Sequence, residues 1–225
     1  MSSGKHPFIA SLAKAFKAAA DHSNAVFQKA YMRDQFEFFG IKTDIRRGIT
    51  RDHFRRIGIA DHTTLETVVK ELWALPQREY QYAAQELMLY HKKLWTSKTI
   101  KLIEYCIVHK SWWDTVDYLN GYGSGMYFQI FPESKEVITS AWNKSNNIWL
   151  NRSSLLFQLK YKSDTDTELL SRYIENLSSS KEFFIRKAIG WVLREYSKTN
   201  AKWVRDFIRD HQLAALSVKE GSKYL

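Results

Sequence analysis

The sequence contains few of the residues that cross-link, bend or interrupt a polypeptide. Its 225 residues include one cysteine, three prolines and nine glycines. A single cysteine excludes an intrachain disulfide, and Cys106 lies in an apolar run where a small core residue is expected. Because proline and glycine are sparse, a turn-rich β fold of this size is disfavoured and long helices are favoured.

Long apolar runs and cofactor motifs are also missing. No run approaches the ~20 apolar residues that a membrane helix needs, and no apolar segment near the N-terminus has the length of a signal peptide. The seven histidines are scattered, without metal-ligand spacing, and no glycine-rich phosphate loop is present. We therefore expect a cytoplasmic protein, in a reducing compartment, that uses no metal and no cofactor and does not bind a membrane.

Apolar residues recur with helical spacing along the whole chain. Thr63 with Glu66, and Thr165 with Glu168, have the spacing of capping boxes at helix starts. Residues 121–125, which include three glycines, form the one expected flexible break. The expected helices span residues 8–20, 24–39, 43–57, 63–75, 77–94, 97–109, 112–120, 134–143, 148–160, 166–177, 183–198 and 202–209.

Segments of the chain resemble one another at a period of about 35 residues. Residues 150–161 with 169–174 align with residues 185–196 with 203–208, and residues 79–90 with 102–107 form a weaker copy. The predicted fold is all-α, an α-solenoid of HEAT-like antiparallel helix pairs, curved with a basic concave face. We expect one domain over residues 1–225, with a frayed tail from about 218 to 225.

Positive charge dominates the composition: 34 lysines and arginines face 24 acidic residues, a formal net charge of +10. Such an excess favours a polyanionic partner. Some cations share helix faces. Arg152 and Lys160 are two turns apart, and two longer stripes are expected at Arg47, Arg51 and Arg55, and at Lys187, Trp191, Arg194 and Lys198. Gly190 would leave space beside the ring of Trp191. The stripes predict sequence-independent binding to duplex phosphates, although solvated surface charge and a packed Trp191 remain alternatives.

The stretch 111–119 gathers two tryptophans and two carboxylates. In a helix, Trp113 and Asp117 share a face because they are four residues apart. Ser111 and Asp114 have the spacing of a capping box, so that pair is expected to start the helix. Asp117 has no such local role and is therefore the residue that needs another explanation, while Trp112 is expected to pack inward.

Several motifs resemble one family, the AlkD-type DNA alkylation repair glycosylases of HEAT-like repeats. They are Ser-Trp-Trp-Asp-Thr-Val-Asp (111–117), Trp-Leu-Asn-Arg (149–152), Ala-Ile-Gly-Trp-Val-Leu-Arg-Glu-Tyr (188–196), Tyr-Met-Arg-Asp-Gln (31–35) and Phe-Gly-Ile-Lys-Thr (39–43). The resemblance implies excision of N3- and N7-alkylated purines from duplex DNA by hydrolysis of the N-glycosidic bond, without base flipping.

The resemblance also implies roles for individual residues. Asp117, Trp113 and Trp191 would form the catalytic site, Arg152 would contact the DNA backbone near the lesion, and Tyr31 would lie at the DNA surface. Further DNA contacts are expected from Lys160, Lys187, Arg194, Lys198, Arg47 and Arg51. Such an enzyme is expected to be a monomer of the bacterial cytosol, associated with the nucleoid when bound to DNA.

Two other readings of the residues stay open. A non-catalytic helical-repeat protein could bind distorted or branched DNA through the same basic stripes. A helical-repeat scaffold for protein partners would need no basic stripe at all.

Overall fold

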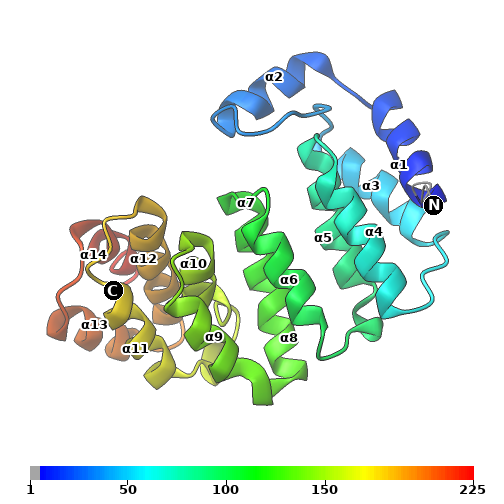
Figure 1. The fold of residues 1–225 in the computed structure, drawn as a ribbon. Helices are drawn as coiled ribbons and strands as arrows, with labels where there is room; N and C mark the ends of the chain where they lie inside the picture. Colours follow the sequence, from blue (N-terminus) through cyan, green and yellow to red (C-terminus); the bar gives the residue numbers. More distant parts are fainter. Residues whose placement is uncertain (1–5) are drawn as a thin grey trace. The chain divides into compact units, whose positions relative to one another are not determined.

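The computed structural model describes residues 6–225, which form helices joined by short connections (Figure 1). Within this range no strand is present, and one isolated β-bridge joins Glu37 and Gln77. The chain is all-α, as the sequence predicted. Contacts divide it into a first unit that ends at Thr99 and a second unit, Ile100–Leu225. The single domain over residues 1–225 and the curved shape of the solenoid stay predictions.

The first unit contains five α-helices in its described part. They are α1 (Pro7–Ala18), α2 (His22–Tyr31), α3 (Thr43–Phe54), α4 (His62–Ala74) and α5 (Arg78–Tyr90), followed by a 3-10 turn over Lys92–Leu94. Helix α4 packs on α5, and α3 packs on both α1 and α5. Leu65, Val68 and Leu72 of α4 are fully buried in this core, because they recur on one face of the helix.

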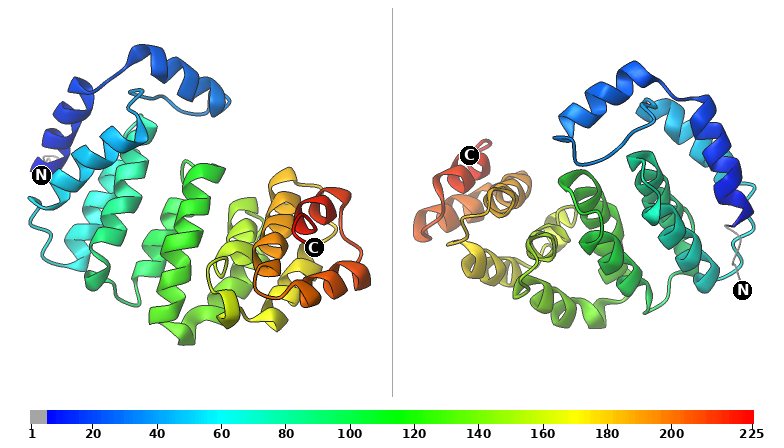
Figure 2. Two further views of the ribbon diagram at one scale, coloured as in Figure 1. Left: turned by 180° about the vertical axis from the view of Figure 1, so that it is seen from behind. Right: turned by 45° about the horizontal axis from the view of Figure 1, so that its top comes forward.

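The second unit contains the remaining helices. They are α6 (Thr99–Val108, which begins at the boundary), α7 (Trp113–Tyr118), α8 (Gly125–Ile130), α9 (Lys135–Asn143), α10 (Ile148–Leu156), α11 (Thr167–Leu177), α12 (Phe183–Ser197), α13 (Ala201–Asp210) and α14 (Ala215–Gly221). Helix α10 packs between α9 and α12, and α12 packs on α13 and α14 (Figure 2). Cys106 is buried, as expected.

One hydrogen-bonding pattern recurs near the start of three helices. The fourth residue of α5, α10 and α12 donates side-chain N–H groups to carbonyls at or just after the end of the preceding helix. Gln81 bonds Trp73 and Leu75, and Asn151 bonds Trp142, Asn143 and Ser145. The third case is Arg186, which bonds Ser180. Terminal carbonyls lack partners in their own helix, so these bonds satisfy them. Asn151 and Arg186 correspond in this pattern, which confirms the alignment of residues 150–161 with 185–196. In the weaker copy the corresponding residue is Gln81, one position later than the predicted alignment places it.

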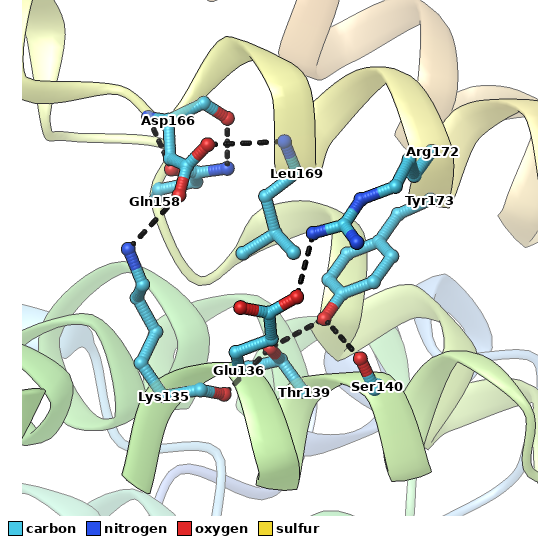
Figure 3. A network of polar contacts seen from close by, with 9 residues as sticks. All are labelled: Lys135, Glu136, Thr139, Ser140, Gln158, Asp166, Leu169, Arg172 and Tyr173. Carbon is cyan, nitrogen blue, oxygen red and sulfur yellow. Dashed lines mark hydrogen bonds and ion pairs between the residues drawn. The ribbon is translucent and has the colours of Figure 1, made fainter. Parts of the chain in front are cut away.

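Polar contacts fix α11 against α9 (Figure 3). Lys135 pairs with Asp166 at 3.1 Å, and the Tyr173 hydroxyl contacts the hydroxyls of Thr139 and Ser140 at 2.8 and 3.0 Å. Gln158, just beyond α10, exchanges two hydrogen bonds with the backbone of Asp166. Asp166 also caps α11, because its Oδ1 accepts from the Leu169 N–H. Helix α10 is thereby held at its end by the neighbouring pair.

Several helix ends differ from the sequence prediction. Asp61 caps α4 in place of Thr63, and Asp166 caps α11 in place of Thr165. Each aspartate lies three residues before the backbone N–H group that its carboxylate accepts, which is the geometry of an N-cap. Helix α2 ends at Tyr31 because Arg33 and Asp34 have left-handed backbones, with φ of 54° and 59°.

The expected glycine break at 121–125 is wrong, because the backbone stays helical there. A π-helical segment, Leu119–Ser124, joins α7 to α8. Gly125 is needed for close packing: a Cβ at this position would lie 2.4 Å from the carbonyl oxygen of Phe157. The Tyr161 hydroxyl donates to the Gly125 carbonyl at 2.6 Å. The glycines therefore let the α7–α8 segment approach α10.

The expectation of a frayed tail over residues 218–225 is wrong for residues 218–221, which belong to a helix. Residues 215–221 form α14, which packs on α12, and Ser217, Glu220 and Gly221 are buried. The Ser217 hydroxyl donates to the Arg186 carbonyl at 2.9 Å. A terminal segment stays ordered when it buries side chains and satisfies its polar groups, and α14 does both.

Candidate functional site

Asp117 is held by a two-point ion pair with Arg152. Arg152 Nε lies 2.8 Å from Asp117 Oδ1 and Nη2 lies 2.9 Å from Oδ2, while Nη1 donates to the Phe184 carbonyl. The side chains are 16% exposed for Asp117 and 5% for Arg152. The planar guanidinium matches both carboxylate oxygens, so the pair fixes the position and the plane of the carboxylate.

Two opposing effects act on the Asp117 carboxyl. Burial raises its pKa above the ordinary value, because a charged group is poorly solvated there. The Arg152 charge and its hydrogen bonds oppose this rise, and the neighbouring charge of Asp114 adds to it. Arg152 is therefore the group that favours the ionised carboxylate at this buried position.

Helix α7 presents Trp113 and Asp117 to one cavity of about 290 Å³. Arg152 of α10 and Glu220 of α14 also line the cavity. The other lining residues belong to α12: Phe183, Phe184, Lys187, Trp191 and Arg194. The structure thus brings the four residues central to the sequence prediction, Trp113, Asp117, Arg152 and Trp191, to one place. Their catalytic and DNA-binding roles stay predictions.

Aromatic packing places α7. Trp112 contacts the rings of Trp149 and Phe184 at centroid distances of 5.9 and 5.3 Å, so it packs inward as expected. Its backbone is extended and it precedes the first residue of α7. The expected capping box is wrong, because α7 has no side-chain cap and the Ser111 hydroxyl donates to the Ile107 carbonyl of the previous helix.

Cations and rings are close together in the cavity. The Arg152 guanidinium carbon lies 5.9 Å from the Trp191 ring centroid and 6.0 Å from that of Phe184. Trp191 is half-buried, so it is neither fully packed nor fully solvated. Gly190 does not leave space beside this ring, contrary to expectation: a Cβ there would lie 2.5 Å from Glu220 Cβ. Gly190 instead allows α14 to approach α12.

Glu220 was missed by sequence reasoning. It is 8% exposed, and its carboxylate contacts Arg194 at 2.6 Å, Lys187 at 3.0 Å and Lys223 at 3.0 Å. Hydrogen bonds from Lys223 and Lys187, together with the charges of these two lysines, lower the pKa of Glu220 from its ordinary value of 4.5 to about 2. The signal in the sequence is weak: Gly190 inside a helical run indicates a close helix neighbour, but nothing local identifies that neighbour as α14.

The other predicted DNA contacts lie elsewhere. Lys160 and Lys198 line a second cavity of about 570 Å³ beside the ends of α10 and α12. The expected shared face of Arg152 and Lys160 is wrong, because α10 ends at Leu156; Arg152 is buried and Lys160 is exposed, with Nζ 3.2 Å from the Tyr122 ring centroid.

The remaining predicted residues belong to the first unit. Arg47 contacts Glu86 at 3.3 Å, Arg51 is exposed on α3, and Tyr31 is 71% exposed at the end of α2. The DNA contacts proposed for these residues, and for Lys160, Lys187, Arg194 and Lys198, stay predictions.

Within residues 6–225, no three His, Cys, Asp or Glu side chains gather so that they could hold a metal ion. In the same range, no helix is both long enough and apolar enough to cross a membrane.

On structural grounds the protein belongs to the class of all-helical repeat proteins, and its cavity contains an Asp–Arg ion pair and two tryptophans. The sequence places it more narrowly: the chain belongs to the family described as DNA alkylation repair enzyme, whose model matches residues 12–225. A similar solved structure is a predicted DNA alkylation repair enzyme from Enterococcus faecalis. It shares 31% identity and a TM-score of 0.86, over 92% of this chain and 96% of that one. None of the curated proteins compared with the chain matches it.

Proposed function

We propose that this protein is a monofunctional DNA glycosylase that hydrolyses the N-glycosidic bond of cationic N3- and N7-alkylated purines in duplex DNA and leaves an abasic site. The observation that carries the proposal is the Asp117 carboxylate, held by Arg152 in a cavity walled by Trp113 and Trp191. Membership in a DNA alkylation repair family supports DNA as the partner.

The chemistry needs few groups. A purine alkylated at N7 or N3 already carries positive charge, so it leaves without a general acid. The enzyme must then stabilise an oxocarbenium-like sugar and orient a water molecule, and one carboxylate can serve both purposes where ordinary glycosidases use two. Arg152 occupies one acceptor position on each oxygen of Asp117, and each oxygen keeps another lone pair for the sugar or the water.

The tryptophans contribute to the same charge stabilisation. The face of an indole ring attracts a cation by roughly 0.5 to 2 kcal/mol, more when water is excluded. Trp113 and Trp191 come from different helices and line the same cavity, so both rings can act on one cationic nucleotide. We propose that the lesion remains stacked in the duplex while this occurs, so that no base-flipping wedge is required.

The test uses a duplex with one N7-methylguanine and follows the released base and the abasic site under single-turnover conditions. We expect the wild type to release the base, and Asp117→Asn to bind the duplex normally but to lose about a hundredfold or more of the rate. Asp114→Asn, one turn earlier on α7, is the matched control and should keep most of the activity.

Two results would contradict the proposal. If the wild type binds the duplex well but releases no base, the protein is a non-catalytic DNA-binding member of the family. If Asp117→Asn is as active as the wild type, the carboxylate that performs the chemistry is another one, and Asp114→Asn then identifies or excludes its nearest neighbour.

A further inference from the structure

The C-terminal helix α14 brings a second carboxylate, Glu220, to the cavity that contains Asp117. Glu220 contacts Lys187 through Oε1 and Arg194 through Oε2, so one carboxylate bridges two cations of α12. Lys187 lies four residues before Trp191, and Arg194 lies three residues after it. The bridge therefore spans the same stretch of α12 that presents the tryptophan to the cavity.

The structure fixes this carboxylate firmly. Gly190 permits the backbones of α12 and α14 to approach, because a side chain there would meet Glu220 Cβ at 2.5 Å and the Ser217 carbonyl oxygen at 2.9 Å. Ser217 is hydrogen-bonded to the Arg186 carbonyl, and Gly221 is buried beside Leu193. Glu220 is thus 8% exposed and anchored on both sides within its helix.

The charges around the cavity show what Glu220 changes. Among the described residues that line it, the cations are Arg152, Lys187 and Arg194 and the anions are Asp117 and Glu220. Arg152 is paired with Asp117, whereas Lys187 and Arg194 share Glu220. Without the charge of Glu220, two unpaired cations would face any ligand in the cavity, and a positively charged ligand would be repelled.

We propose that Glu220 is a specificity-determining residue of this site, which makes the cavity accept a nucleotide with positive charge in preference to a neutral one of the same shape. The proposal rests on the glycosylase function above and adds a second anion to it. Asp117 would stabilise the charge that develops during bond cleavage, and Glu220 would compensate the cations that would otherwise exclude a charged lesion.

The test compares binding to two duplexes that differ by one charge. One contains a pyrrolidine abasic analogue, whose ring nitrogen is protonated, and the other contains the neutral tetrahydrofuran analogue. The measured quantity is the ratio of the two dissociation constants for each protein. We expect Glu220→Gln to reduce the preference for the charged analogue about tenfold, since removal of one nearby charge acts on the cation but hardly on its neutral counterpart.

Lys223→Gln is the matched variant, and it should change the preference for the charged analogue in the opposite direction. Lys223 contacts Glu220 at 3.0 Å but does not line the cavity, so its removal leaves more of the Glu220 charge acting on the ligand. We expect the preference for the charged analogue to rise at least twofold. This variant also provides the test if Glu220→Gln does not fold, as judged by circular dichroism and thermal unfolding.

The outcomes separate this inference from the proposed function. Equal preference in the wild type and Glu220→Gln overturns the role of Glu220, and so does an unchanged preference in Lys223→Gln if Glu220→Gln is unfolded. Release of N7-methylguanine by the wild type is measured independently of this ratio. If the wild type releases the base but its preference for the charged analogue does not depend on Glu220, the inference is refuted and the glycosylase proposal is unaffected.

Discussion

Asp117 and Arg152 are 35 residues apart in the chain; Arg152 is buried, and the Asp117 side chain is 16% exposed. A buried ion pair is weak support for stability, because the desolvation of both charges offsets their attraction. Breaking such a pair leaves one charge buried and unpaired, however, which is strongly unfavourable. The orientation of the Asp117 carboxylate therefore depends on the guanidinium of Arg152.

This dependence gives a pH prediction for Arg152→Lys. Burial raises the pKa of Asp117 and Arg152 opposes the rise, so loss of the two-point guanidinium contact raises this pKa further. The proposed reaction needs the ionised carboxylate, so the acid limb of the pH–rate profile should move to higher pH. The measurement is single-turnover base release from pH 4 to 9. An acid limb at the wild-type position would show that Arg152 does not control the ionisation of Asp117.

Arg152 also makes contacts that the sequence did not predict. The sequence resemblance assigns it to the DNA backbone, whereas the structure commits three of its nitrogens to Asp117 and Phe184. Contact with a phosphate stays a prediction. The structure adds a role that the sequence did not suggest, which is to hold the carboxylate.

At the scale of elements, the packing of α14 on α12 completes the cavity. The contact depends on the absence of a side chain at Gly190, and it carries Glu220 into position. Overpacking a close helix contact by one methyl group costs about 1 to 3 kcal/mol, because backbone atoms cannot yield easily. The last helix therefore contributes both to stability and to the site.

Gly190→Ala tests this contact. We expect a loss of about 1 to 3 kcal/mol in the free energy of unfolding, together with weakened substrate binding, since α14 must move. Gly48→Ala in α3 is the matched control: apart from its chain neighbours and the backbone of its own helix, no atom lies within 4 Å of the added Cβ, so it should stabilise the protein by about 0.5 to 1 kcal/mol. Urea unfolding measures both. Equal stability of Gly190→Ala and the wild type would show that α14 adapts without cost.

At the scale of the whole molecule, the net charge of +10 is the property most relevant to DNA. Not every cation contributes equally to phosphate binding. Lys187 and Arg194 are bound to Glu220, whereas Lys160 lies over the Tyr122 ring and Lys198 pairs with the more exposed Glu195. Lys160 and Lys198 are therefore the best placed of the predicted DNA contacts in this unit to exchange their local contacts for a phosphate.

The salt dependence of binding to an undamaged duplex tests this assignment. Each phosphate contact adds about one to the slope of log Kd against log salt concentration. Lys160→Gln and Lys198→Gln should each lower that slope by about 1, uniformly across DNA sequences. Lys202→Gln on α13 is the control, because Lys202 was not predicted to contact DNA, and its slope should be unchanged. An unaltered slope in the first two variants would exclude them from the interface.

The helical fold, the approximate helix positions and the placement of Trp113 and Asp117 on one helix face could all be predicted from the sequence. These features follow from local periodicity and the geometry of single helices. The sequence did not determine where helices end when two caps compete, as at Asp61 and Thr63, because the choice depends on backbone geometry a few residues away.

Only the tertiary structure decided which charges meet. Asp117 with Arg152, and Glu220 with Lys187 and Arg194, are pairs between helices that approach through close packing at positions such as Gly190 and Gly125. The strength of these pairs depends on burial and on distances of about 3 Å, and sequence spacing specifies neither across separate elements. For that reason the sequence identified the catalytic candidate, whereas the fold supplied the groups that hold it and set the charge around it.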